Sequence, residues 1–214
     1  MPLSKQGIVD KLDTIPTFHL ENTAHKIFPI PDESGEKCIR WYVDVDDAQS
    51  ALVMVQALNP EVPLQLGVTP LGTAFALSQG WQPNEAPVPL RLHASKAVLM
   101  ALAEERGQEP AADAFPLYGC EELTSARVMP FWTNAADVKE TWLSAGRPPE
   151  AFPTSLTVVD LRKLVQSAMS DDHWSTLMLI ASSKAITKAQ ELQEMEETRV
   201  AAGLGEEPPP LESA

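Results

Sequence analysis

A set of similar residues recurs along this chain at a fixed separation of 90 residues. The matched positions are aromatic, acidic, proline or apolar: Trp41-Tyr42 with Phe131-Trp132, Asp47 with Asp137, Leu52 with Trp142, Pro63 with Pro153, Leu66 with Leu156, Val68 with Val158, and Leu71 with Leu161. Residues 15–18 and 115–118 also match, at a separation of 100. A fixed register of this kind indicates a duplicated unit. We therefore predict two related halves that pack with pseudo-twofold symmetry.

Each half is predicted to run strand, strand, helix, strand, helix. In the first half, residues 15–20 and 38–45 combine alternating polarity with aromatic and β-branched side chains, which is typical of strands. Asp46 and Asp47 then favour a helix start through the helix dipole, and a third strand and a second helix follow at 64–68 and 71–78. The predicted class is α/β, with two such halves and an added C-terminal helix.

Proline-rich and polar stretches divide the chain into four predicted parts. The halves are residues 1–82 and 83–170, joined by a stiff connector with prolines at 83, 87 and 89 and by a linking helix over 93–106. A C-terminal helix is predicted over 171–202, with a helical apolar stripe at Trp174, Leu177, Met178, Ala181, Ala185 and Ile186. Residues 203–214, which are acidic and rich in proline, are predicted to be a flexible tail.

The charge balance limits the classes of partner. Thirty acidic and 16 basic side chains give a net charge of -14, which repels nucleic acids and anionic membrane surfaces. About 18 consecutive apolar residues are needed to span a bilayer as a helix, and the sequence has no such run. Residues 1–10 resemble neither a secretory signal nor a transit peptide. We expect protein partners, with membrane association only through them, and either a cytosolic chain or one whose targeting segment has been removed.

The sequence contains no recognisable arrangement of catalytic or metal-ligating residues, so we expect neither an enzyme nor a cofactor. The four histidines are isolated, and the acidic run at 44–47 lacks the glycine and distal glutamate of a calcium loop. We interpret that run as a strand end and helix start. Cys38 and Cys120 lack zinc-site spacing. They are compatible with a disulfide or with two buried thiols.

Tryptophan is enriched in binding hot spots but is also a large core residue. Trp41 and Trp132 lie in predicted strands, and we assign them to the core. Trp81 adjoins the proline connector and Trp174 opens the predicted C-terminal helix. We predict a partner-binding set of four residues: Trp174, Leu177, Met178 and Trp81.

Several segments together resemble the Tic-twenty-two-like proteins, namely Tic22, the twenty-two-kilodalton component of the translocon at the inner envelope membrane of chloroplasts, and its cyanobacterial relatives. The segments are IPTFHLEN, WYVDVDDAQSAL, NPEVPLQLGVTPLGTAFAL, FPLYG and MPFWTNAADVKETWL, between Ile15 and Met169. The resemblance implies a symmetric pair of α/β halves with apolar grooves. It also implies a non-catalytic, chaperone-like binder of translocating preproteins in the plastid intermembrane space or the cyanobacterial periplasm.

The predicted helix at 171–202 and the tail lie beyond the resembling region, and a plastid targeting segment is absent from the chain. The added helix and the tail suggest an alternative function. An exposed helix and tail could attach the chain, as a scaffold or linker subunit, to the soluble face of a plastid membrane complex such as a photosynthetic one.

Overall fold

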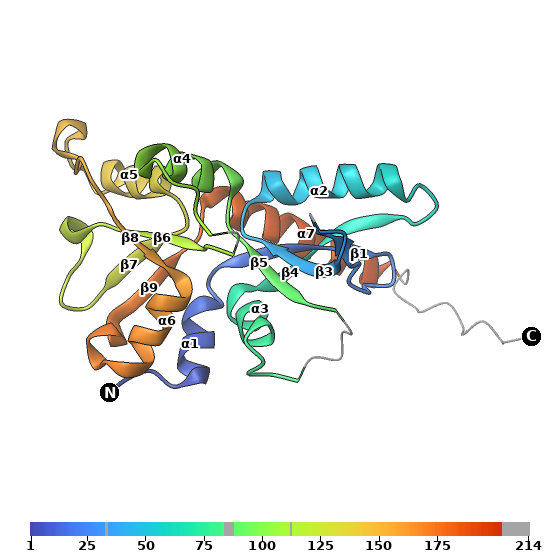
Figure 1. Ribbon diagram of the computed structural model, residues 1–214, viewed down its shortest axis with the longest axis horizontal. Helices are drawn as coiled ribbons and strands as arrows, with labels where there is room; N and C mark the ends of the chain where they lie inside the picture. Colours follow the sequence, from blue (N-terminus) through green and yellow to red (C-terminus); the bar gives the residue numbers. More distant parts are fainter. Residues whose placement is uncertain (33, 84–87, 112, 203–214) are drawn as a thin grey trace, which may run out of the picture.

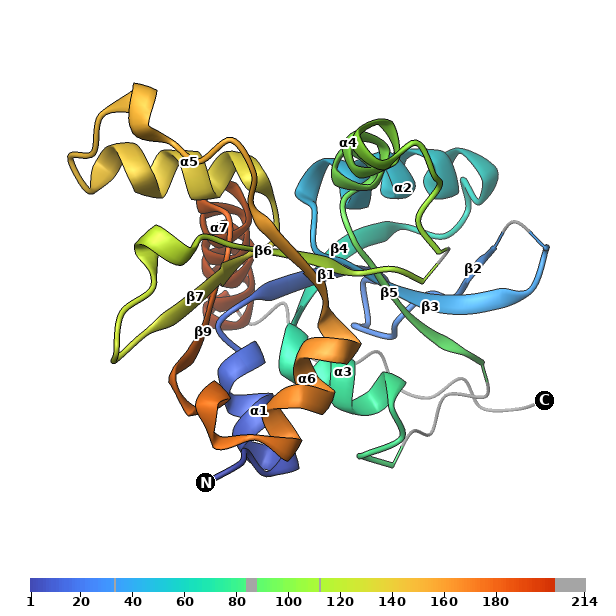
Figure 2. The ribbon, with the colours of Figure 1, turned by 60° about the vertical axis from the view of Figure 1, so that its left-hand side comes forward.

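The computed structural model describes residues 1–32, 34–83, 88–111 and 113–202. The predicted tail at 203–214 and part of the proline connector lie outside these residues. Two β-sheets lie side by side in a central layer, with helices above and below them (Figure 1). The same layering is visible after a 60° turn (Figure 2). The predicted α/β class is confirmed.

Within the described part of the chain, the first sheet has five strands, and their order places β4 at one edge. The strands are β1 (Pro16–Asn22), β2 (Ile30–Pro31), β3 (Lys37–Tyr42), β4 (Leu64–Pro70) and β5 (Leu90–His93). The order is β2-β3-β1-β4, and β5 also pairs with β3. β1 is antiparallel to both β3 and β4, whereas β5 runs parallel to β3.

The second sheet repeats this arrangement with four strands. They are β6 (Pro116–Gly119), β7 (Met129–Trp132), β8 (Thr157–Asp160) and β9 (Leu177–Ile180), in the order β8-β6-β7-β9. β6 is antiparallel to β7 and β8, and β9 runs parallel to β7. Thus β6, β7, β8 and β9 occupy the places that β1, β3, β4 and β5 hold in the first sheet.

Cross-strand pairs follow the two separations predicted from the sequence. Phe18 faces Tyr42 in the first sheet, and Tyr118 faces Trp132 in the second. The loop contacts agree, because the Leu71 N–H donates to the Ile15 carbonyl at 2.8 Å and the Leu161 N–H donates to the Phe115 carbonyl at 2.9 Å. The strand pairings therefore recur at separations of 100 for the first strand and 90 for its partners; the pseudo-twofold symmetry stays a prediction.

Helices follow the strands in the same order in both halves. The α-helices are α1 (Lys5–Leu12), α2 (Val45–Leu58), α3 (Leu71–Ser78), α4 (Lys96–Arg106), α5 (Ala135–Ser144), α6 (Leu161–Ser170) and α7 (Ser183–Ala201), and the short 3₁₀ turns are η1 (Glu121–Leu123), η2 (Pro149–Ala151) and η3 (Asp172–Thr176). The Asp44 side chain caps α2 by accepting from the N–H groups of Asp46 and Asp47, and Asn134 caps α5 at the matching position. No helix of the described chain is both long and apolar enough to cross a membrane.

The core ties the halves together. One buried cluster spans both sheets and includes Trp41 and Phe75 from the first half with Leu117 and Leu164 from the second. A second cluster lies between β1 and α2, and a third between β7 and α5. Trp41 and Trp132, predicted as core residues, are each 1% exposed. Cys38 and Cys120 are free, buried thiols.

The last helix of each half packs on the other half. α4 follows β5 of the first sheet, yet its Val98 packs against the cluster around Trp132 in the second half. α7 follows β9 of the second sheet, yet its Ala185 belongs to the cluster around Phe18 in the first half. The C-terminal helix is therefore the counterpart of α4 in the same strand-helix order.

Three predicted boundaries differ from the structure. The C-terminal helix begins at Ser183 instead of Asp171, because η3 and strand β9 occupy the intervening residues. The linking helix begins at Lys96, because residues 90–93 form β5. Since β5 pairs with β3, the first sheet extends beyond the predicted division at 82 and 83.

Candidate protein-binding groove

A groove of about 640 Å³ lies between edge strand β4 and the C-terminal half of α7. Its walls are Gln65, Leu66, Gly67 and Val68 on β4, and Ala189, Leu192, Gln193, Met195, Glu196, Glu197 and Arg199 on α7, with Glu21 and His25 at one end. The lining combines apolar side chains, among them Leu66, Val68, Leu192 and Met195, with charged ones, among them Glu196 and Glu197. A concave surface that offers both apolar and polar groups is typical of a binding site.

The sequence of α7 explains why the helix forms one wall of the groove. Ala185, Ala189 and Leu192 recur at helical spacing and pack against the cluster around Phe18 in the first half. Ser182 caps the helix by accepting from the Ala185 N–H. Polar contacts add to this packing, since Lys184 Nζ lies 2.5 Å from Asp46 on α2. The helix crosses from the second half and runs beside β1 and β4.

A buried polar network closes one end of the groove. Glu21, at 6% exposure, accepts a hydrogen bond from Gln65 Nε2 at 2.9 Å and contacts His25 Nδ1 at 2.8 Å and His19 Nε2 at 3.4 Å. Burial alone would raise the pKa of Glu21, but hydrogen bonds from His19, Gln65 and His25 lower the pKa to about 2. The carboxylate is therefore ionised across the physiological range.

The turn after β1 connects this polar network to α7. The Asn22 side chain accepts hydrogen bonds from the N–H groups of Ala24 and Lys26, and His25 adopts a left-handed φ of 55°. His25 Nε2 lies 3.4 Å from Glu196 and also contacts the Arg199 guanidinium. Arg199 in turn donates to the Thr23 carbonyl at 3.1 Å. The turn and the end of α7 are thus joined by several polar contacts.

Gly67 makes room for the network in the middle of β4. A Cβ atom at this position would lie 2.5 Å from His19 Nε2 and 2.6 Å from Glu21 Oε2. Any larger residue would displace these buried polar side chains. The glycine therefore allows polar groups to lie beneath an otherwise ordinary edge strand.

The charged groups of this network are paired with one another. Among the described residues, no group of three or more His, Cys, Asp or Glu side chains is arranged to hold a metal ion. The chemistry available at the groove is hydrogen bonding, apolar contact and attraction of positive charge.

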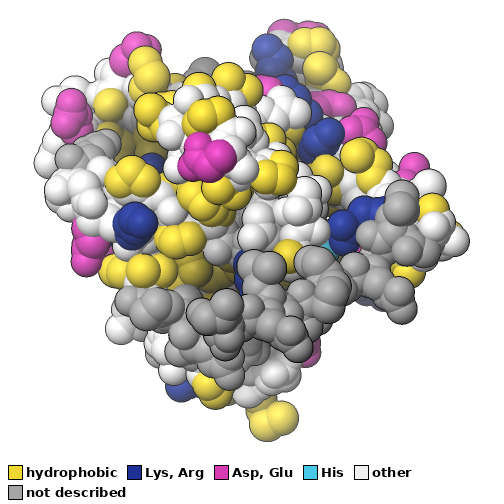
Figure 3. All heavy atoms as spheres, turned by 90° about the vertical axis from the view of Figure 1, so that its right-hand side faces the viewer, with side chains coloured by type: hydrophobic (Ala, Val, Ile, Leu, Met, Phe, Trp, Pro, Cys, Tyr) yellow, Lys and Arg dark blue, Asp and Glu magenta, His cyan; other side chains and the backbone are white. Residues whose placement is uncertain are grey.

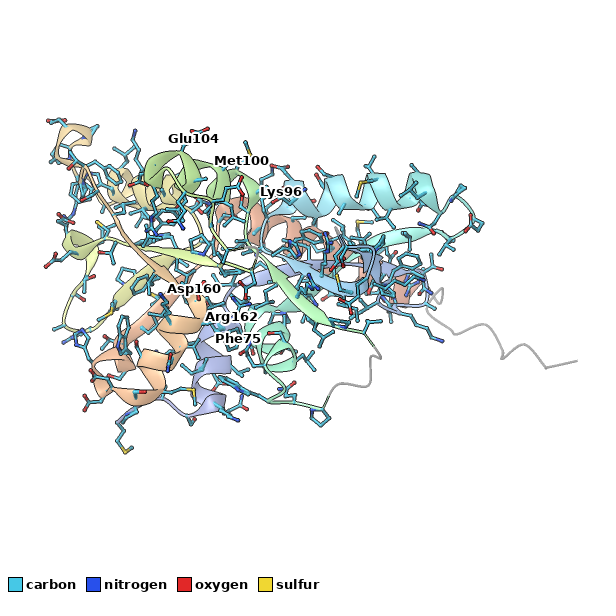
Figure 4. All side chains as sticks on the ribbon, viewed as in Figure 1. Phe75, Lys96, Met100, Glu104, Asp160 and Arg162 are labelled. Carbon is cyan, nitrogen blue, oxygen red and sulfur yellow. The ribbon has the colours of Figure 1, made fainter. Side chains whose placement is uncertain are left out.

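Of the four predicted partner-binding residues, Leu177 is a core residue at 3% exposure, because it lies inward on β9. Met178, its neighbour on the outward side, is 48% exposed. Trp174 is half-buried in η3, with its ring centroid 6.1 Å from that of Phe131. Trp81 is half-buried against Phe75 of α3, labelled in Figure 4, with ring centroids 5.4 Å apart.

Trp81 follows α3 of the first half, whereas the other three lie in η3 and β9 of the second half. Leu177 belongs to the core cluster that spans both halves, and Trp81 and Trp174 pack against that cluster. The binding roles of Trp81, Trp174 and Met178 stay predictions. None of the four lines the groove beside β4.

Exposed apolar side chains also occur away from the groove. Val53, Met54 and Leu58 project from α2, and Met100 projects from α4 between Lys96 and Glu104 (Figure 4). The view onto the end of the molecule near α2 shows apolar side chains interspersed with charged ones (Figure 3). A shallower hollow of about 450 Å³ lies on α2, formed by that helix alone. The groove at β4 differs because a strand edge and a helix from opposite halves form it.

Comparison with solved structures identifies the fold. No family model matches the sequence, and no curated protein matches it. Anabaena Tic22, described with the words protein transport, superposes with a TM-score of 0.64 and 16% identity, over 88% of this chain and 97% of that chain. Tic22 from Plasmodium falciparum superposes with a TM-score of 0.65 and 15% identity, over 87% of this chain and 97% of that chain. The chain has a Tic22-like fold.

The likeness confirms the resemblance recognised in the sequence and extends beyond it. The share of this chain that matches each Tic22 structure exceeds the stretch from Ile15 to Met169. At 15% and 16% identity, the likeness establishes the Tic22-like fold alone.

Proposed function

We propose that this chain is a non-catalytic protein-binding factor of plastid protein transport, which holds unfolded or extended segments of translocating proteins in the β4–α7 groove. The observation that carries the proposal is the groove itself, which is lined by both apolar and acidic side chains. The Tic22-like fold supports it, since one of the similar structures is described with the words protein transport. A chaperone-like action and a plastid location are parts of this proposal.

The acidic residues that line the groove favour basic clients. Glu196 and Glu197 line the groove, and the whole chain has a net charge of -14. Complementary charge raises the rate of encounter and is weakened by salt. Segments that alternate basic and apolar residues therefore match the acidic and the apolar side chains that line the groove.

The test is binding of an unfolded client and of a basic, apolar peptide by a groove variant and a matched control. Met195 lines the groove at 65% exposure, and Met54 lies on α2 at 59% exposure. Both are exposed enough that glutamine should leave the fold intact. Covering a methionine side chain contributes about 1 to 2 kcal/mol, so Met195→Gln should weaken binding roughly fivefold or more.

Met54→Gln should leave that affinity unchanged. Equal affinities of both variants and the wild type for the peptide would show that the peptide binds outside the groove. If the wild-type chain binds no peptide at low salt and does not slow aggregation of unfolded clients, the proposed function is wrong.

The scaffold alternative rests on the C-terminal helix and the tail. Part of the apolar stripe predicted along that helix is instead in the core, because residues 177–180 form β9 and Leu177 and Ala185 are buried. Stoichiometric co-purification with a membrane complex, abolished by removal of α7, would favour this alternative. We therefore propose the transport function.

A further inference from the structure

We propose that the partner segment binds by adding a strand to the outer edge of β4, and that its side chains alternate between apolar and basic. The inference rests on the proposed function and specifies how the groove holds its client. Strand addition is a common mode of peptide recognition, in which main-chain hydrogen bonds give affinity and alternate side chains give specificity.

β4 has an edge with backbone groups that point away from the sheet. Among the residues that the structure describes, it is the terminal strand of its sheet and pairs with β1 alone. The hydrogen bond from the Leu71 N–H to the Ile15 carbonyl shows which residues along β4 direct their backbone groups toward β1. In such a ladder every second residue bonds to the neighbouring strand, so Gln65, Gly67 and Thr69 bond to β1. Leu66 and Val68 direct their N–H and C=O groups outward.

Two features limit how long the added strand can be. Pro70 closes β4 and lacks an N–H, and Pro63 lies just before its first residue. The Leu64 N–H is already used, because it donates to Gln56 Oε1 of α2 at 2.8 Å. The open edge is centred on Leu66 and Val68, so a partner would pair over about five residues.

The groove gives the added strand one apolar side. Val68 is 38% exposed at the edge, and Leu192 and Met195 of α7 line the opposite wall. Alternate side chains of an added strand point to opposite faces of the sheet. One set of them would contact these apolar residues.

The charges identify the chemistry of the other set. The groove lining holds three carboxylates, those of Glu21, Glu196 and Glu197, and one guanidinium, that of Arg199, which is paired with Glu196. The excess charge beside the edge is therefore negative, which favours lysine or arginine in the partner. It also disfavours a second copy of this chain, because two such acidic walls would face each other.

The probe is a nine-residue peptide that alternates lysine and valine, together with two backbone N-methylated forms. One form is methylated on the valines and the other on the lysines. Each methyl group removes one N–H donor without changing the side chains. An added strand directs only alternate N–H groups toward β4, so one form should bind at least tenfold more weakly and the other within threefold of the parent peptide.

A matched pair of protein variants locates the site. Val68→Arg places a positive charge at the edge, and Val53→Arg makes the same change on α2, where Val53 is 71% exposed. The first should weaken peptide binding at least tenfold, and the second should alter it less than twofold. Circular dichroism of both variants checks that the fold is kept.

The outcomes separate the two proposals. If the parent peptide binds in a Met195-dependent way and both methylated forms bind equally, the groove is a client site but strand addition is wrong. If binding is insensitive to Val68→Arg, the edge of β4 is not used. If the wild-type chain forms a dimer that Val68→Arg dissociates, the occupant is a second copy. Absence of any binding overturns both proposals.

Discussion

Replacing Glu21 by glutamine should destabilise the fold through loss of the charge and of the hydrogen bonds that the carboxylate accepts, because the two side chains have nearly the same size. The pKa of Glu21 is lowered from 4.5 to about 2 in the folded chain. Each pKa unit corresponds to about 1.4 kcal/mol. The ionised carboxylate thus stabilises the fold by roughly 3 kcal/mol. We expect Glu21→Gln to reduce the free energy of unfolding at pH 7 by roughly 2 to 3 kcal/mol, since glutamine keeps some hydrogen bonds.

The effect of Glu21 has a definite pH dependence. Because the folded state has the lower pKa, the contribution is complete above the unfolded value of about 4.5 and is lost as the pH falls toward 2. The difference in stability between the wild type and Glu21→Gln should therefore be constant from pH 7 to about pH 5.5 and shrink below that.

Urea unfolding followed by tryptophan fluorescence, at pH values from 7 to 3, measures this difference. Glu197→Gln is the matched control, since Glu197 lines the same groove but is exposed. It should change the stability by less than about 0.5 kcal/mol. A Glu21→Gln loss that persists undiminished at pH 3, or one no larger than that of the control, would refute the electrostatic reasoning.

Three other predictions concern the fold that supports the groove. Burial and nearby cations lower the pKa of His93 to about 4. Because the folded state has the lower pKa, the contribution of His93 to the free energy of unfolding is complete above about pH 6.5 and is lost as the pH falls toward 4. In His93→Phe the free energy of unfolding should therefore vary less with pH between 6.5 and 4. Ala185→Glu would bury a charge at a position 1% exposed and should lower the urea midpoint and detach α7 from the first half, which limited proteolysis would detect. Gly72→Ala places a Cβ atom 2.2 Å from the Val9 carbonyl oxygen and should destabilise by about 1 to 3 kcal/mol in thermal unfolding. Gly7→Ala, whose nearest contact is 3.4 Å, should be neutral or stabilising.

Sequence patterns predicted those parts of the fold in which local and long-range signals agree. The recurrence of Trp41-Tyr42 as Phe131-Trp132 located β3 and β7, whose aromatic residues are buried. The acidic helix start after β3 was also predictable, because Asp44 caps α2 through its side chain. Large buried side chains and caps have strong local signatures, so these elements were found without a structure.

Short apolar runs were not predictable in the same way. Residues 177–180 are Leu, Met, Leu and Ile, a run that fits either a buried strand or one turn of an apolar helix. Its parallel pairing with β7 decides in favour of a strand, and no local signal reveals that pairing. The same applies to residues 90–93, which pair with β3 across more than forty residues of chain. Helix α1 and the hairpin strand β2 were not predicted either.

The groove could not be predicted because it forms between segments that are distant in sequence. Glu21 and Arg199 meet the same turn through His25, although about 180 residues separate them. Tryptophan content directed attention to Trp81 and Trp174 instead, which pack on the edges of the core. The available signal was the pair Glu21 and Gly67, a buried acid and a glycine in strands that otherwise favour apolar and β-branched residues.

Hydrogen–deuterium exchange with and without the lysine–valine peptide shows whether the peptide binds in the β4–α7 groove. Exchange should become slower on binding in two segments, residues 64–70 of β4 and 189–199 of α7, which form the walls of the groove. The exposed apolar face of α2, with Val53 and Met54, should show no change. Protection confined to α2, or to Trp174 and Met178, would contradict the claim that the β4–α7 groove is the protein-binding site.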